Sequence, residues 1–122
     1  MAKRILIVED ENELARALQI RLEKAGFVTI LASDGEEGLE KAKEEKPDLI
    51  ILDIILPKRD GYSVCRKLKL DKEMSHIPII MLSVKAQRHE IEEGYKNGAS
   101  FYITKPFEIQ TLLSQIEALL QK

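Results

Sequence analysis

The sequence has 122 residues, of which 44% are hydrophobic and 33% are charged, and its formal net charge is −2. Such values are typical of a globular domain that folds without a disulfide or a structural metal. They disfavour direct nucleic-acid binding, because no basic stripe is present. The apolar run before Glu9 is also too short for a signal peptide or a membrane span.

Short apolar runs alternate with segments of helical periodicity. The pattern predicts strands at 5–8, 28–32, 49–52, 79–82 and 101–103. A helix follows each strand: one with leucines at 14, 18 and 22, a capped one from 34 to about 45, one from about 61, one from about 86 and one over 109–120. Gly26 and Gly98 occupy positions that suit a left-handed residue after a helix.

Continuous apolar character indicates strands that are buried on both faces, as in a parallel sheet covered by helices. We therefore expect an α/β domain over residues 1–122, with (βα)5 topology and a flavodoxin-like three-layer sandwich. The expected strand order is 2-1-3-4-5, which places the first and third strands side by side at the switch point where ligands bind. The single cysteine, Cys65, cannot form an internal disulfide, so a cytoplasmic setting is expected.

Carboxylates follow two of the strands that this order makes neighbours. Glu9 and Asp10 come after the first apolar run, with Glu11 next, and Asp53 comes after the third. Clustered carboxylates repel one another unless a cation neutralises them, and an oxygen-only ligand set favours Mg²⁺. The three N-terminal acids are equally well explained as helix-capping residues. Asp53 is not, so the pattern favours a functional site.

A hydroxyl and an ammonium group complete this predicted edge of the sheet. Ser83 ends the fourth apolar run, and Lys105 follows the fifth. A carboxylate can act as the nucleophile in phosphoryl transfer, and the oxygens of the transferring group require cations and donors. Taken alone, Ser83 is better explained as a helix cap and Lys105 as a solvated loop residue. Together with two acidic strand ends they form a phosphoryl-transfer site.

These residues resemble those of the receiver domain of two-component response regulators, over essentially the whole chain. The resemblance is carried by four segments in order: residues 5–10, residues 53–57 with 60–61, Ser83 with 85–87, and residues 98–99 leading to 102–107. Four departures accompany it. Glu9 stands where aspartate is also common, Ser83 stands where threonine is commoner, and Val84 is bulkier than the small residue usual beside the hydroxyl. Lys58 and Arg59 make the loop after Asp53 unusually basic, which favours a solvated turn over a partner contact.

The resemblance implies a metal-dependent phosphoacceptor. Asp53 would accept the phosphoryl group from a phosphohistidine on a histidine kinase or a phosphotransfer protein. Asp10, Asp53 and the backbone carbonyl of Ile55 would bind Mg²⁺ directly, with Glu9 acting through water. The domain would be a signalling switch rather than an enzyme in the usual sense, although it would catalyse its own phosphorylation and slow dephosphorylation.

The resemblance also implies how the signal would spread. Ser83 and Lys105 would hold the phosphoryl oxygens, and the Lys105–Pro106 bond would be cis. Tyr102 would move inward when Ser83 turns toward the phosphoryl group, unless it is simply a strand aromatic at the sheet edge. The face formed by the fourth helix, fifth strand and fifth helix would then dock a target or a second copy. We expect no membrane partner.

Three alternatives remain at this stage. A flavin-binding module on the same fold would need a phosphate loop after the first strand, where Glu9, Asp10 and Glu11 would repel the phosphate. An aspartate phosphohydrolase resembling the haloacid dehalogenases would carry a second acid at the position of Ile55. A pseudo-receiver would use the domain only to bind proteins, without phosphorylation. The sequence leaves open whether the chain acts alone or is a fragment of a longer regulator.

Overall fold

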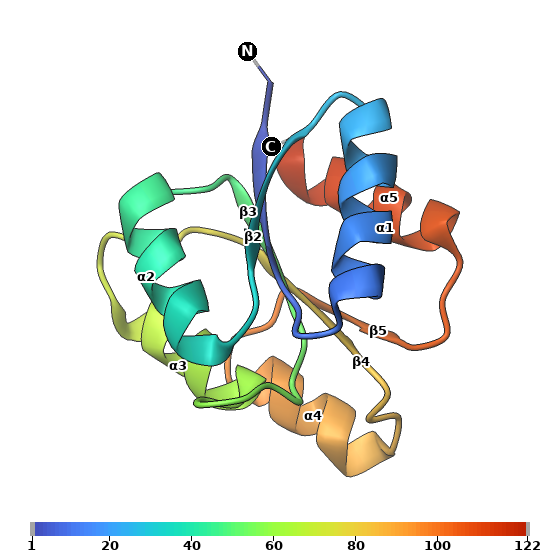
Figure 1. Ribbon diagram of the computed structural model, residues 1–122. Coiled ribbons are helices and arrows are strands. Elements are labelled where there is room, and N and C mark those ends of the chain that lie inside the picture. Colours follow the sequence, from blue (N-terminus) through green and yellow to red (C-terminus); the bar gives the residue numbers. More distant parts are fainter. Residues whose placement is uncertain (1, 122) are drawn as a thin grey trace.

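Five parallel strands form one sheet in the order β2-β1-β3-β4-β5 in the computed structural model, which describes residues 2–121. The strands alternate with five helices (Figure 1): β1 Arg4–Val8, α1 Asn12–Lys24, β2 Val28–Ala32, α2 Gly35–Glu45, β3 Leu49–Leu52, α3 Gly61–Leu70, β4 Ile79–Ser83, α4 Arg88–Lys96, β5 Phe101–Thr104 and α5 Ile109–Leu120. The predicted (βα)5 fold and its strand order are confirmed. Within residues 2–121, no helix combines the length and apolar composition needed to cross a bilayer.

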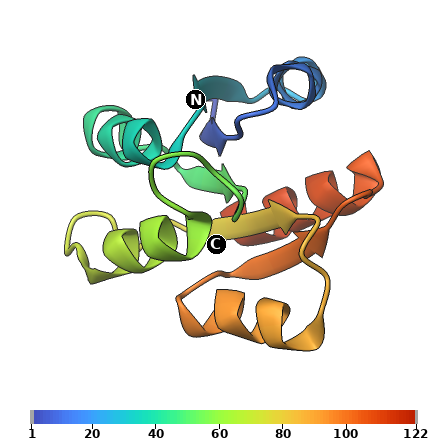
Figure 2. The same ribbon diagram turned by 60° about the horizontal axis from the view of Figure 1, so that its bottom comes forward.

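Helices cover both faces of the sheet and create two apolar cores. Alternate side chains of β1 point to opposite faces, so Ile5 and Ile7 pack with α1 and α5, whereas Leu6 and Val8 pack with α2 and α3. Figure 2 shows the two helix layers on either side of the strands. This double coverage explains why β1, β3 and β4 are almost wholly apolar in sequence.

The helix boundaries follow local capping chemistry. Asp34 accepts a hydrogen bond from the Glu37 N–H at 2.8 Å and begins α2, as predicted. Gly26 and Gly98 adopt positive φ values of 97° and 110° after α1 and α4. Helix α4 begins at Arg88, two residues later than predicted from the sequence, because the Gln87 N–H donates to Glu90 Oε1 at 3.1 Å in a capping-box arrangement.

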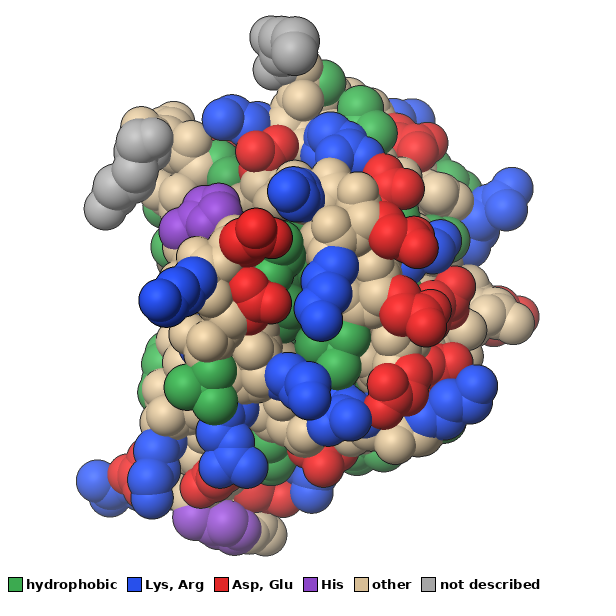
Figure 3. Space-filling view, turned by 90° about the vertical axis from the view of Figure 1, so that its left-hand side faces the viewer, with side chains coloured by type: hydrophobic (Ala, Val, Ile, Leu, Met, Phe, Trp, Pro, Cys, Tyr) green, Lys and Arg blue, Asp and Glu red, His purple; other side chains and the backbone are tan. Residues whose placement is uncertain are grey.

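Charges of both signs are interspersed on the face that carries α2 and α3 (Figure 3). The basic pair in the loop after β3 takes part in this pattern. Lys58 Nζ lies 3.6 Å from Asp34 Oδ2, and Arg59 Nε lies 2.9 Å from Glu36 Oε2. These two residues therefore pair with acids at the start of α2.

Candidate functional site

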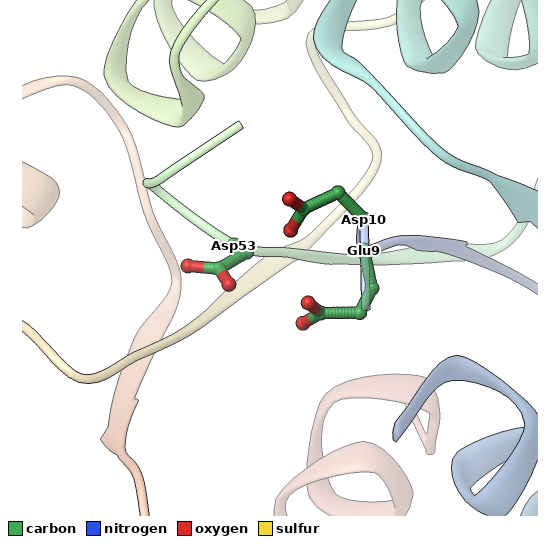
Figure 4. Close-up of side chains that lie close together, drawn as sticks. All are labelled: Glu9, Asp10 and Asp53. Carbon is green, nitrogen blue, oxygen red and sulfur yellow. The ribbon is translucent and has the colours of Figure 1, made fainter. Parts of the chain in front are cut away.

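The carboxyl ends of β1 and β3 bring three carboxylates together (Figure 4). Val8 and Leu52 are partners in the parallel ladder, so the residues that follow them, Glu9 and Asp53, leave the sheet side by side. Glu9 is 3% exposed and Asp53 is 6% exposed, whereas Asp10 is exposed. One oxygen from each of the three carboxylates lies within 4.8 Å of the others. The predicted acidic cluster therefore forms, with two of its members buried.

Lys105 reaches this cluster from the end of β5, the edge strand two places from β3. Its backbone N–H donates to the Ser83 carbonyl at 2.8 Å, and the Lys105–Pro106 bond is cis, as expected. Its Nζ lies 2.9 Å from Asp53 Oδ2, 3.0 Å from Glu9 Oε1 and 3.8 Å from Glu11 Oε1. One ammonium group thus bridges the two buried carboxylates.

The negative charge of the carboxylates at the site exceeds the positive charge of Lys105. Burial raises the pKa of Glu9 by more than the hydrogen bond from Lys105 lowers it. Burial alone would lower the pKa of Lys105, but hydrogen bonds to Asp53 and Glu9 outweigh burial and the pKa is raised. Three carboxylates face a single ammonium group, so the cluster keeps negative formal charge. Its all-oxygen donor set suits a hard divalent cation such as Mg²⁺.

The two oxygens of Asp53 have separate partners. Oδ1 accepts a hydrogen bond from the Ile55 N–H at 3.2 Å, and Oδ2 accepts from Lys105.

Ser83 ends β4, the strand next to β3, and is fully buried. Its hydroxyl accepts a 3.4 Å hydrogen bond from the Lys85 N–H. Val84, the bulky neighbour noted in the sequence, is 60% exposed.

Tyr102 lies on β5 with its ring buried and 7% exposed. Its hydroxyl donates to the Lys85 carbonyl at 2.6 Å, which links β5 to the segment that follows Ser83. Burial, together with nearby negative charge, raises the pKa of this phenol to about 12. The ring is therefore directed inward and held by the β4–α4 connection. Whether it moves with Ser83 stays a prediction.

Two contributors to the site were not assigned to it from the sequence. Gly61 was expected as a helix start and as part of the resemblance, with no role at the site, but its N–H donates to the Ile54 carbonyl at 2.8 Å, and a Cβ there would lie 2.2 Å from the Asp53 carbonyl oxygen. Glycine at this position therefore lets α3 approach the end of β3. The Asp60–Gly61 pair was the available signal. Glu11 adds a third acid near Lys105.

Comparisons with known proteins point in one direction. The family model described as "Response regulator receiver domain" matches residues 5–117. A putative response regulator from Chloroflexus aurantiacus has a solved structure that superposes with a TM-score of 0.95 at 32% identity, with complete coverage of both chains.

Two curated relatives are transcriptional regulators. The chain is 45% identical over 122 residues to the alkaline phosphatase synthesis transcriptional regulatory protein PhoP of Bacillus subtilis, and 40% identical over 119 residues to the DNA-binding dual master transcriptional regulator RpaA of Synechocystis. The matches cover 100% and 98% of this chain but only 50% and 49% of the relatives. The chain thus spans about half their length. The name of RpaA includes DNA binding, so the expectation of no direct nucleic-acid binding finds no support here.

Proposed function

Because the chain belongs to the receiver-domain family of response regulators, we propose that residues 1–122 form a phosphoacceptor switch in which Asp53 takes the phosphoryl group. The observation that carries this proposal is the buried Asp53 carboxylate at the sheet edge, with Lys105 Nζ at 2.9 Å and the acids of β1 beside it. The donor is a phosphohistidine on a histidine kinase or a phosphotransfer protein.

In the proposed reaction an oxygen of Asp53 attacks phosphorus. The O–P bond forms as the N–P bond of the phosphohistidine breaks, and the imidazole nitrogen keeps the electron pair. Lys105 and Ser83 stabilise the charge on the phosphoryl oxygens, one as a cation and the other as a hydroxyl donor. The Ile55 N–H already donates to Asp53 Oδ1 and orients the carboxylate. Attack of water on the phosphorus of the acyl phosphate later breaks the O–P bond to Asp53, releases inorganic phosphate and restores the carboxylate.

The carboxylate cluster fits a magnesium ion, because three oxygens from Glu9, Asp10 and Asp53 lie within 4.8 Å of one another. Asp10, Asp53 and the Ile55 carbonyl would hold the ion directly, and Glu9 through water. When bound, Mg²⁺ neutralises negative charge that develops on the transferring group. Lys105 alone cannot balance that charge, since it already bridges two carboxylates.

The output of the proposed switch is the face formed by α4, β5 and α5. Phosphorylation draws Ser83 toward the phosphoryl oxygens, and this movement favours the buried position of Tyr102. The face then docks a target or forms a homodimer. The buried thiol of Cys65, which has no second cysteine to pair with, supports a cytoplasmic setting. A pseudo-receiver that only binds proteins is the alternative.

The test is binding of beryllofluoride, a phosphoryl mimic, followed by ¹⁹F NMR at increasing Mg²⁺ concentration. We expect protein-bound fluorine signals for the wild type only when Mg²⁺ is present. Asp53→Asn should abolish them, and Asp10→Ala should remove most of the response to Mg²⁺. Glu13→Gln, an exposed acid in the first turn of α1, is the matched control and should behave as the wild type. Bound signals that persist in Asp53→Asn contradict the proposal, and a folded wild type without them favours the pseudo-receiver.

A further inference from the structure

Helix α4 contains a glycine that its backbone does not require. Gly94 lies in the last turn, two residues before Lys96 ends the helix, and it is the only buried residue of α4. It is not among the glycines with positive φ, which are Gly26 and Gly98. Because glycine destabilises a helix relative to alanine, its presence here calls for a packing reason.

The packing reason is the ring of Tyr102. A Cβ on Gly94 would lie 2.8 Å from Tyr102 Cδ2, 3.0 Å from Tyr102 Cε2 and 2.9 Å from Met81 Sδ. Contacts this short force a neighbour to move. Met81 is fully buried and is the ladder partner of Tyr102 on β4. The ring is thus enclosed between α4 and the sheet at the point where Gly94 leaves space.

Hydrogen bonds restrain both the side chain and the backbone of Tyr102. The Tyr102 hydroxyl donates to the Lys85 carbonyl at 2.6 Å, and the Tyr102 backbone N–H donates to the Tyr95 hydroxyl at 3.1 Å. One turn before Gly94, the Tyr62 hydroxyl donates to the Glu90 carbonyl at 2.9 Å. The hydrogen bonds made by Tyr95 and Tyr62 hold α4 in place, so we expect a side chain at residue 94 to displace the ring rather than the helix.

We propose that Gly94 is a positioning residue: because it has no side chain, it leaves the space that the buried ring of Tyr102 occupies. The size of the side chain at this position sets the equilibrium between the buried and the outward position of that ring. The consequence for signalling rests on the function proposed above. The buried ring holds the Lys85 carbonyl, two residues from Ser83, so the same balance is linked to occupation of the Asp53 site. By reciprocity, a change that disfavours the buried ring weakens binding of a phosphoryl mimic.

The primary variant is Gly94→Ala. The added methyl group displaces the Tyr102 ring outward, while alanine itself favours the helix. We expect the aromatic resonances of Tyr102 to shift toward those of a solvent-exposed tyrosine in the mimic-free protein. Affinity for beryllofluoride in Mg²⁺ should fall on the order of tenfold, the size of effect that a moderate overpacking penalty produces. His89→Ala, an exposed substitution in the same helix, is the matched control and should leave both readouts unchanged.

A double-mutant cycle distinguishes a specific packing contact between Gly94 and Tyr102 from a general loss of stability. Tyr102→Val removes the ring, and the remaining short contact of a methyl group at residue 94 is with Met81 Sδ, which belongs to a flexible side chain that can adjust. Gly94→Ala should therefore lower stability to urea in the wild-type background and raise or preserve it in the Tyr102→Val background. This rescue can be measured even if the single variant folds poorly.

The outcomes are distinct. Displaced Tyr102 resonances and rescue by Tyr102→Val support the proposal. It is overturned if the ring of Gly94→Ala stays buried with wild-type mimic affinity, or if the substitution has the same effect in both backgrounds. If neither the wild type nor any variant binds beryllofluoride, the proposed function fails. The Tyr102 resonances and the stability cycle are both recorded without the mimic, so they still decide whether Gly94 provides the space for the ring.

Discussion

Removal of the ammonium group of Lys105 is the most informative test of the electrostatics of the site. Lys105 Nζ lies 2.9 Å from Asp53 and 3.0 Å from Glu9, whose side chains are 7% and 2% exposed. In Lys105→Met the aliphatic stem is largely kept, but two buried carboxylates lose their shared cation. The substitution therefore probes charge more than packing.

The structure sets the expected magnitude. Breaking a buried ion pair by removing one partner costs about 3–5 kcal/mol, because the other charge is left buried and unpaired. Two features reduce the cost here: Asp10 opens the cluster to water, and Glu9, whose pKa is already raised by burial, can take up a proton. We expect Lys105→Met to lower the free energy of unfolding by about 3 kcal/mol without divalent ions.

Urea unfolding in EDTA and in Mg²⁺ measures this effect. A ligand that binds only the folded state adds about 2.7 kcal/mol of stability at a hundredfold excess over its Kd. Because Mg²⁺ no longer competes with an ammonium group in Lys105→Met, the deficit should shrink to about half or less when Mg²⁺ is saturating. The control is Arg88→Met, which removes an exposed ion pair to Glu92 and should cost at most about 0.5 kcal/mol. Equal deficits in EDTA and Mg²⁺, or a loss no larger than the control, would refute the reasoning.

Three further outcomes follow from local environments. Burial raises the pKa of Cys65 to about 11, so its thiol should not react with a disulfide reagent at pH 8 until the protein is unfolded in urea. The pKa of Tyr102 is raised to about 12, so ultraviolet titration against Tyr102→Phe should place its ionisation there, and its contribution to stability should be complete below about pH 10 and decline toward pH 12. Asp60 accepts a hydrogen bond from the Ser63 N–H at 3.0 Å as the N-cap of α3, so Asp60→Ala should lower the free energy of unfolding by about 1 kcal/mol in urea.

The strand ends explain how much of the site follows from sequence alone. Apolar runs located β1, β3 and β4, and the parallel-sheet rule then brought Glu9 and Asp53 to one edge. The contact of Lys105 with Asp53 followed from the same topology, because Lys105 comes directly after β5. These are consequences of chain order and of two-sided burial, which a single sequence displays.

Contacts that depend on side-chain packing did not follow in the same way. The sequence assigned Glu9 only a water-mediated role toward a metal, whereas its carboxylate directly accepts a hydrogen bond from Lys105 in the structure. Gly94 carries no local signal, since its role arises from the ring of Tyr102 across the layer between α4 and the sheet. The start of α4 was misplaced because a glutamine–glutamate capping box is less distinctive than an aspartate cap.

Intact-mass spectrometry after incubation with a small-molecule phosphodonor tests the central claim most directly. The wild type should gain the mass of one phosphoryl group in Mg²⁺ and none in EDTA, because the reaction needs a cation beside Asp53. Asp53→Asn, a nearly isosteric change, should remain folded and gain none. A full phosphoryl mass gain in Asp53→Asn, or equal labelling of the wild type with and without Mg²⁺, would contradict the assignment of Asp53 as a magnesium-dependent phosphoacceptor.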